Sequence, residues 1–197
     1  MKNTVLASLL VLAAFPAFAE RADREKPISL EANRINVDDV KKVQVYEGNV
    51  VLTQGTMVIR SDRIVVTQDS DGFQRGVAYA GPGGLARFKQ KREGKDEYIE
   101  GEGERIDPDA RTEITEFFVR AWVRSGLDEV KGNYISYDSL HEKYYVTSGV
   151  TPDGKGPAKA EGGRVRAIIQ PKGKGEAQPP AGESLSLKPA ANIPNKE

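Results

Sequence analysis

Residues 27–147 alternate apolar and polar side chains with a period of two, and turn residues interrupt the alternation at short intervals. The clearest alternating segments are residues 43–46, 50–53, 57–60 and 64–67. Alternation of this kind places apolar side chains on one face of a β-strand and polar ones on the other. We find no convincing apolar stripe at helical spacing in this region. The pattern therefore predicts an all-β chain of many short antiparallel strands, folded as a sandwich, barrel, jelly roll or solenoid.

The same region contains an internal repeat, which becomes visible when the sequence is compared with itself at a shift of 71 residues. The identical residues that this shift aligns are Ile28 and Ile99, Glu31 and Glu102, Arg34 and Arg105, Ile35 and Ile106, Asp38 and Asp109, Gly55 and Gly126, and Ile64 and Ile135. Any two alternating β segments align to some degree, but here turn residues coincide as well as apolar ones. The repeat predicts two similar units stacked along one axis, because neither unit alone covers its apolar face.

The beginning of the chain has the pattern of a cleaved secretory signal. Residues 1–19 combine a short basic start, an apolar run and the small-residue motif Ala17-Phe18-Ala19. The apolar run is too short for a membrane anchor, which needs about 20 residues to cross a bilayer. The sequence therefore predicts cleavage after Ala19, export to the periplasm, and a short extension at residues 20–26 before the folded domain.

The other end of the chain is polar. Residues 172–197 are rich in Pro, Lys and Glu and carry almost no apolar periodicity, which predicts a disordered tail. Before the tail, the β-branched stretch 164–170 is expected to form the last strand, which Pro171 ends. The predicted domain accordingly spans residues 27–171.

A stacked roll leaves unpaired backbone groups on its first and last strands. The candidate end strands are the stretches 28–32 and 164–170, and neither contains an internal proline. Pairing the end of one copy with the start of the next is a heterologous contact, which builds filaments rather than closed dimers. The sequence therefore predicts head-to-tail self-association through edge strands.

Composition excludes several kinds of chemistry. The chain has no cysteine, one histidine, 29 basic and 29 acidic residues, and a formal charge of zero. A thiol nucleophile, a cysteine-ligated metal site and a disulfide framework are impossible, and a nucleic-acid binder would show a basic excess. Acidic pairs sit at predicted turns or on a strand face, and His141 lies in a polar turn. We therefore expect no enzyme, no catalytic residue, no metal, no cofactor and no nucleic-acid partner.

One segment carries a family resemblance. Residues 45–67 read Val-Tyr-Glu-Gly-Asn-Val-Val-Leu-Thr-Gln-Gly-Thr and continue through Ser61-Asp62 into another strand, which resembles the OstA-like domain family. The stretch 27–32 resembles the first strand of that family, and residues 130–138 resemble a second copy of the unit. The second half departs from the motif, because Val119-Arg120-Ala121 stands where the first half has Gly48-Asn49-Val50.

The resemblance implies a fold, a ligand and partners. The fold is an antiparallel β-jellyroll, a slightly open roll of two sheets. The ligand is lipopolysaccharide, held by its lipid A acyl chains. The implied function is a periplasmic transport protein that bridges the inner and outer membranes and shuttles lipopolysaccharide to the outer-membrane translocon for outer-membrane assembly. The implied partners are a jellyroll component of the inner-membrane export complex, the N-terminal jellyroll domain of that translocon, and further copies of the chain.

Combining the resemblance with the alternation gives candidate site residues. The expected lipid-contacting side chains, all placed on the inner face of the roll, are Ile28, Leu30, Ile35, Val50, Leu52, Ile59, Ile64, Phe88, Phe118 and Ile135. The expected rim contacts to sugars and phosphates are Arg75, Arg87 and Lys89. Ion pairs at such a rim are salt-sensitive.

Two alternatives remain open at this point. One is another component of the same export system that carries the same domain. The other is an extracellular β-solenoid that acts on carbohydrate, which would need its acids stacked between repeats. The repeat-matched acids are Glu31 with Glu102 and Asp38 with Asp109. Whether these four line one groove distinguishes this alternative from a lipid carrier.

Overall fold

The computed structural model describes residues 23, 26–72, 74–92, 94–151, 156–158 and 163–171. The predicted signal peptide and the predicted tail lie outside these residues. The described chain forms the strands β1 (Ser29–Glu31), β2 (Arg34–Asp38), β3 (Val43–Gln54), β4 (Met57–Gln68), β5 (Gln74–Tyr79), β6 (Ala86–Lys91), β7 (Tyr98–Gly103), β8 (Arg105–Asp109), β9 (Ile114–Ser125), β10 (Asp128–Asp138), β11 (Lys143–Thr147) and β12 (Arg166–Ile168). Every pairing between them is antiparallel, so the all-β prediction is confirmed.

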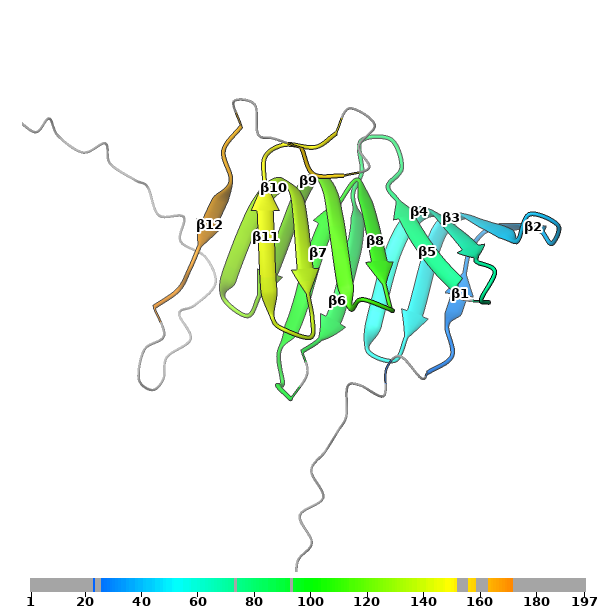
Figure 1. The fold of residues 1–197 in the computed structure, drawn as a ribbon, viewed down its shortest axis with the longest axis horizontal. Helices are drawn as coiled ribbons and strands as arrows, with labels where there is room; N and C mark the ends of the chain where they lie inside the picture. The colour runs from blue at the N-terminus through cyan, green and yellow to red at the C-terminus, as the bar shows by residue number, and fades with distance from the viewer. Residues whose placement is uncertain are drawn as a thin grey trace, which may run out of the picture.

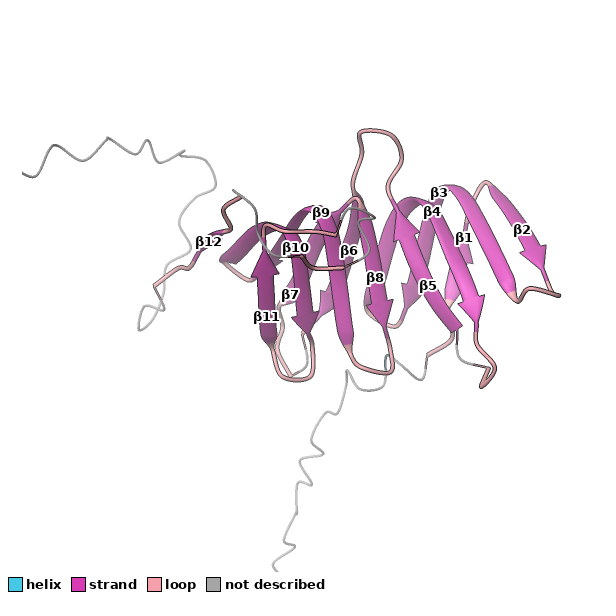
Figure 2. Cartoon of the chain, turned by 45° about the horizontal axis from the view of Figure 1, so that its top comes forward, coloured by secondary structure: helices cyan, strands magenta, loops and turns pink. Residues whose placement is uncertain are grey.

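The strands form two layers that share four long members (Figures 1 and 2). One layer runs β2-β3-β4-β5-β8-β9-β10-β11, and the other runs β1-β3-β4-β6-β7-β9-β10-β12. Each long strand pairs in one layer along one half of its length and in the other layer along the rest. β3, for example, pairs with β2 at residues 43–47 and with β1 at residues 51–53.

Bulges allow the long strands to pass from one layer to the other. In β3 the register with β4 shifts between Glu47 and Val50, where Gly48 and Asn49 have φ of 81° and 49°. In β9 the intervening residues are Val119 and Arg120, with φ of 58° and 54°. Extra residues at a bulge bend the strand and increase its twist. The departure from the Gly-Asn motif therefore leaves the bulge intact, although a β-branched residue now adopts a left-handed conformation.

The predicted repeat of 71 residues is confirmed in the strands themselves. The bounds of β2 and β8 differ by 71 at both ends, as do those of β3 and β9. Residues with positive φ recur at the same shift, in the pairs Lys42 and Glu113, Gly48 and Val119, Asn49 and Arg120, and Gly55 and Gly126. Six strands of the first half are therefore followed by six equivalent strands in the second.

The core lies between the two layers. Its cluster of buried side chains comprises Val50, Leu52, Ile59, Ile64, Val66, Ala78, Ala86, Phe88, Ile99, Ile106, Phe117, Ala121, Val123, Ile135 and Tyr137. Phe118 is buried but lies outside this cluster, with the Arg105 guanidinium carbon 3.6 Å from its ring centroid. The expectation that Phe118 faces inward is therefore wrong. The inward aromatic residue is its neighbour Phe117, and Ala121 and Val123 continue the same alternation beyond the bulge.

The two ends of the roll are open edges. β1 and β2 lie at one end and β11 and β12 at the other (Figure 1). Each of these four strands pairs on one side only among the described residues. The described part of the chain contains no helix long and apolar enough to cross a membrane.

Candidate functional site

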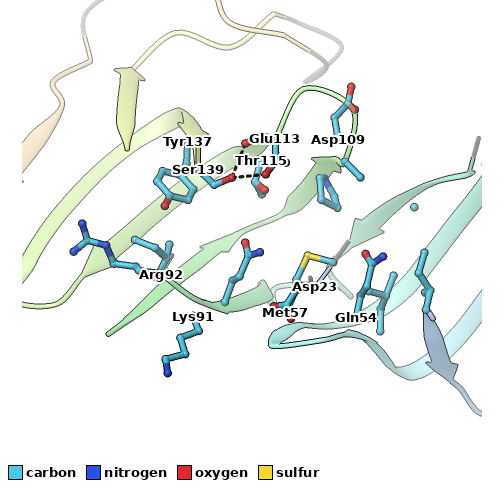
Figure 3. A pocket seen from close by; sticks show the side chains of 17 residues that line it. Asp23, Gln54, Met57, Lys91, Arg92, Asp109, Glu113, Thr115, Tyr137 and Ser139 are labelled. Carbon is cyan, nitrogen blue, oxygen red and sulfur yellow. Dashed lines mark hydrogen bonds between the residues drawn. The ribbon is translucent and has the colours of Figure 1, made fainter. Parts of the chain in front are cut away.

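A groove runs along the open side of the roll, between the two layers (Figure 3). It crosses both repeats, since Ile28 and its repeat partner Ile99 both line it. Its remaining lining residues are Asp23, Leu52, Gln54, Met57, Gly76, Gln90, Lys91, Arg92, Pro108, Asp109, Ala110, Glu113, Thr115, Tyr137 and Ser139.

The groove is small. Its volume is about 110 Å³, which is less than the roughly 150 Å³ of an engineered cavity that holds benzene. Gly76 contributes to this space, because a Cβ there would lie 3.6 Å from Leu52 Cδ1. An elongated apolar ligand therefore needs the layers to separate or the lining side chains to move.

One mouth of the groove is polar. The Ser139 hydroxyl donates to a Glu113 carboxylate oxygen at 3.2 Å, as the dashed line in Figure 3 marks. Arg92 forms ion pairs with Glu97 at 2.6 Å and with Glu142 at 2.8 Å. Hydrogen bonds from Arg92 and then Lys95 lower the pKa of Glu142, whereas burial raises the pKa of the Tyr137 phenol. This mouth therefore combines fixed charges with a neutral aromatic side chain.

Asp23 also lines the groove. Asp23 is buried and accepts a hydrogen bond from the Thr56 amide at 2.8 Å and another from the Thr56 hydroxyl. These bonds fix Asp23 against the turn that joins β3 to β4, close to Gln54 and Met57 in Figure 3. Sequence periodicity does not reveal this contact, because it joins residues 33 positions apart and Asp23 lies in a polar segment.

The predicted lipid-contacting residues fall into three groups. Six of them belong to the buried core cluster: Val50, Leu52, Ile59, Ile64, Phe88 and Ile135. Leu30 packs against that cluster, and Ile28 lines the groove while remaining 45% exposed. Ile35 is 53% exposed on the open edge of β2, and Phe118 lies outside the core cluster as described above.

The predicted rim cations are all engaged with carboxylates. Arg75 makes a two-point contact with Asp107, with Nε–Oδ1 and guanidinium–Oδ2 distances of 2.8 Å and 2.7 Å. Arg87 and Lys89 alternate with the inward residues of β6 and pair with acids of β7, namely Glu102 and Glu100, both at 3.1 Å. Sequence reasoning missed the basic residues that do line the groove, Lys91 and Arg92.

The acids that a hydrolase would need have other roles. Asp38 accepts hydrogen bonds from the backbone amides of Val40 and Lys41 in a turn. Asp109 accepts the equivalent bonds from Arg111 and Thr112. Within the described residues, no group of three acids or histidines is placed to hold a metal ion. Of the four repeat-matched acids, Asp109 lines the groove, whereas Glu31, Asp38 and Glu102 do not, so the four do not line one groove.

An open two-layer roll whose strand pairings are all antiparallel defines a β-jellyroll. Residues 29–143 match the family described as "LptA/(LptD N-terminal domain) LPS transport protein". The match covers more than half of the chain, so the chain belongs to this family.

Curated relatives and a solved structure agree with this assignment. The lipopolysaccharide export system protein LptA of Escherichia coli K12 is 33% identical over 147 residues, which cover 74% of this chain and 78% of that protein. LptA of Haemophilus influenzae is 27% identical over 130 residues, covering 66% and 74% of the two chains. The crystal structure of LptH, the LptA homologous periplasmic component of the Pseudomonas aeruginosa lipopolysaccharide transport device, superposes with a TM-score of 0.66. That superposition covers 76% of this chain and 99% of LptH at 24% identity, and it supports the jellyroll fold.

Proposed function

We propose that the chain is a periplasmic lipopolysaccharide carrier that bridges the inner and outer membranes and delivers its cargo to the outer-membrane translocon. The observation that carries the proposal is the groove between the layers, which runs across both repeats in a chain of the LPS transport family. Export would follow from the signal sequence at residues 1–19, with cleavage after Ala19.

The groove suits acyl chains because its walls are continuous with the apolar core. Burial of an acyl chain stabilises a complex by about 0.8 kcal/mol per CH₂ group. The acyl chains leave a membrane in which they were equally shielded from water. The groove therefore needs only to shield them as well as the bilayer does. The candidate contacts are Ile28 and Leu52, which line the groove, and Leu30 and Phe88, which belong to or pack against the adjoining core. A narrow resting groove that opens for cargo favours passage over tight retention.

Sugars and phosphates of the cargo would remain outside the groove. A phosphate there would compete with the carboxylates that already pair with Arg75, Arg87 and Lys89. Exchange between two anions on one cation costs little at the more exposed pairs of Arg87 and Lys89 and more at Arg75, whose partner Asp107 is buried, and salt weakens all three contacts. We therefore propose weak, salt-sensitive headgroup contacts at these residues.

The open edges are the proposed docking sites for partners. The family description groups LptA with the N-terminal domain of LptD, which supports a jellyroll partner on the outer-membrane side. We propose that the β1–β2 edge and the β11–β12 edge pair with the jellyroll of the inner-membrane export complex, with that of the translocon, and with further copies of this chain. Strand addition supplies backbone hydrogen bonds to edges that otherwise lack them.

A binding experiment on the mature protein tests this function. Lipopolysaccharide should remain with the purified chain or saturate it, and the Gly76→Leu variant should bind less because its side chain occupies the groove. Val77→Leu is the matched control, since residue 77 faces away from the core on the same strand. Absence of binding by the parent chain, or equal binding by the folded Gly76→Leu variant, would contradict the proposal.

A further inference from the structure

The two halves of the chain align at a shift of 71 residues, but equivalent side chains differ in their exposure to solvent. Ile106 on β8 is 0% exposed, whereas Ile35, which holds the same position on β2, is 53% exposed. Ile99 on β7 is 1% exposed, whereas its equivalent Ile28 is 45% exposed. The second half is covered because β5 and β6 of the first half pair with β8 and β7. The first half lacks such a cover within the described chain.

We infer that a second copy of the chain supplies this cover by repeating the internal junction with the same register. This inference rests on the head-to-tail association proposed above and adds the residue pairing. In the internal junction, β6 pairs with β7 and β5 pairs with β8. Between copies, β12 of one chain would take the place of β6 and pair with β1 of the next chain, which takes the place of β7. In the other layer, β11 would take the place of β5 and pair with β2 of the next chain, which takes the place of β8.

The strand pairings within the chain fix the equivalent positions. Ile59 on β4 pairs with Phe88, and its equivalent Val130 on β10 pairs with Ala167, so Ala167 occupies the position of Phe88. Phe88 pairs across the internal junction with Gly101, whose equivalent in the first half is Leu30. The predicted contact is therefore Ala167 with Leu30 of the next copy.

Size at this position supports the pairing. In the internal junction the large Phe88 lies opposite glycine, where a Cβ would come within 2.4 Å of the Phe117 ring. Between copies the small Ala167 lies opposite the larger Leu30. In both junctions a large side chain therefore lies opposite a small one, although the large one is on the opposite strand. Such complementary sizes are expected of strands that pack together.

The same register explains the exposed apolar side chains at both ends. Gln90 pairs with Ile99 inside the chain, and the equivalent pair between copies is Ile169 with Ile28. Ile169 is 76% exposed in the single chain, so this contact covers both isoleucines. In the other layer the pair Ala78 and Ile106 corresponds to Val146 and Ile35, which covers Ile35 as well.

Charge also agrees with this register. Arg87 forms an ion pair with Glu102 across β6 and β7 at 3.1 Å. The equivalent residues between copies are Arg166 and Glu31, which are exposed on their edge strands and opposite in charge. Directly opposed charges stabilise a strand pair, and like charges destabilise it. The inferred junction therefore contains an ion pair from Arg166 of one copy to Glu31 of the next.

Charge reversal in the mature chain tests the ion pair. Glu31→Arg or Arg166→Glu alone should weaken self-association about 5- to 30-fold in sedimentation experiments, because each opposes two like charges. The double reversal should return the association constant to within about threefold of the parent. If the double variant lost as much association free energy as the two single variants together, the inferred pair would be overturned.

Disulfide formation between single-cysteine variants measures the register of β1 against β12 directly, because the parent chain has no cysteine of its own. Under oxidation, a mixture of Glu31→Cys and Arg166→Cys chains should cross-link faster than a mixture of Ser29→Cys and Arg166→Cys chains. Directly opposite Cβ atoms lie about 4.5–5.5 Å apart and diagonal ones about 7–8 Å, and a disulfide needs short separations. Oligomers that cross-link preferentially through residue 29 would overturn the register and leave head-to-tail association intact. A monomer at all concentrations would overturn both.

Discussion

Phe88 on β6 and Phe117 on β9 meet edge to face across the two layers, with ring centroids 5.6 Å apart and an interplanar angle of 84°. Both rings are buried, and Gly101 opposite Phe88 leaves the space that the Phe117 ring fills. This pair is a buried aromatic contact between the two layers.

Removal of one ring should destabilise the fold. We expect Phe88→Ala to lower the free energy of unfolding by about 3–5 kcal/mol, because it deletes a buried aromatic side chain and leaves a cavity. Urea denaturation measures the change. Tyr98→Ala is the control on the neighbouring strand, where the ring is 43% exposed, and it should cost about 1 kcal/mol or less. Equal effects of the two substitutions would show that the ring pair does not join the layers.

The bulge in β9 should tolerate glycine. Val119 has a φ of 58°, a region that costs a β-branched residue about 1–2 kcal/mol. Val119→Gly relieves this strain, so we expect its stability to equal that of the parent or exceed it by up to about 1 kcal/mol. The reciprocal change, Gly48→Val, should be destabilising, since a Cβ at residue 48 would lie 2.7 Å from Asn33 Nδ2. Thermal unfolding of both variants measures the changes. A destabilised Val119→Gly variant together with an unaffected Gly48→Val variant would contradict the equivalence of the two bulges.

Arg75 is predicted to act mainly as a structural partner of Asp107. The Asp107 side chain is 7% exposed, so Arg75→Met leaves a buried carboxylate without its two-point partner. Loss of one member of a fully buried pair costs about 3–5 kcal/mol, and the 43% exposure of Arg75 reduces our expectation to about 1–3 kcal/mol. Arg87→Met, at an exposed pair, should change stability by less than about 1 kcal/mol. Chemical denaturation distinguishes them, and a neutral Arg75→Met would favour a cargo role for this residue.

Acid should weaken the fold through its paired carboxylates. Hydrogen bonds from Arg124 and then Lys89 lower the pKa of Glu100 below its ordinary value of 4.5, as Arg92 and Lys95 do for Glu142. A lowered pKa contributes stability that is complete above the unfolded-state pKa and is lost as pH falls through the folded-state value. Unfolding free energy should therefore decline below about pH 4.5, and the decline should be shallower in the double variant Glu100→Gln, Glu142→Gln. An unchanged pH dependence in that variant would exclude these two groups as its source.

Much of the architecture could be predicted from the sequence, because period-two alternation and a fixed repeat are local signals. The shift that aligns Ile64 with Ile135 also aligns the strands that contain them. The jellyroll assignment came from the resemblance in residues 45–67, since alternation alone does not distinguish a jelly roll from a solenoid.

The face of Phe118 is the main failure. Phe117, Ala121 and Val123 keep one alternation across the bulge and belong to the core, so Phe118 lies on the opposite face, where Arg105 and Tyr134 bury it. Cross-strand partners are also invisible to periodicity. The ion pair of Arg75 with Asp107 joins residues 32 positions apart, so only the fold reveals that this predicted rim cation is already paired.

Photo-crosslinking tests the central claim that cargo lies between the layers. A photo-reactive residue in place of Met57, which lines the groove, should form an adduct with lipopolysaccharide. The matched position is Trp122, whose neighbours Ala121 and Val123 point into the core and whose indole donates to Glu129 at 3.1 Å. The account predicts adducts at residue 57 and none at residue 122. Adducts at residue 122 without any at residue 57 would contradict it.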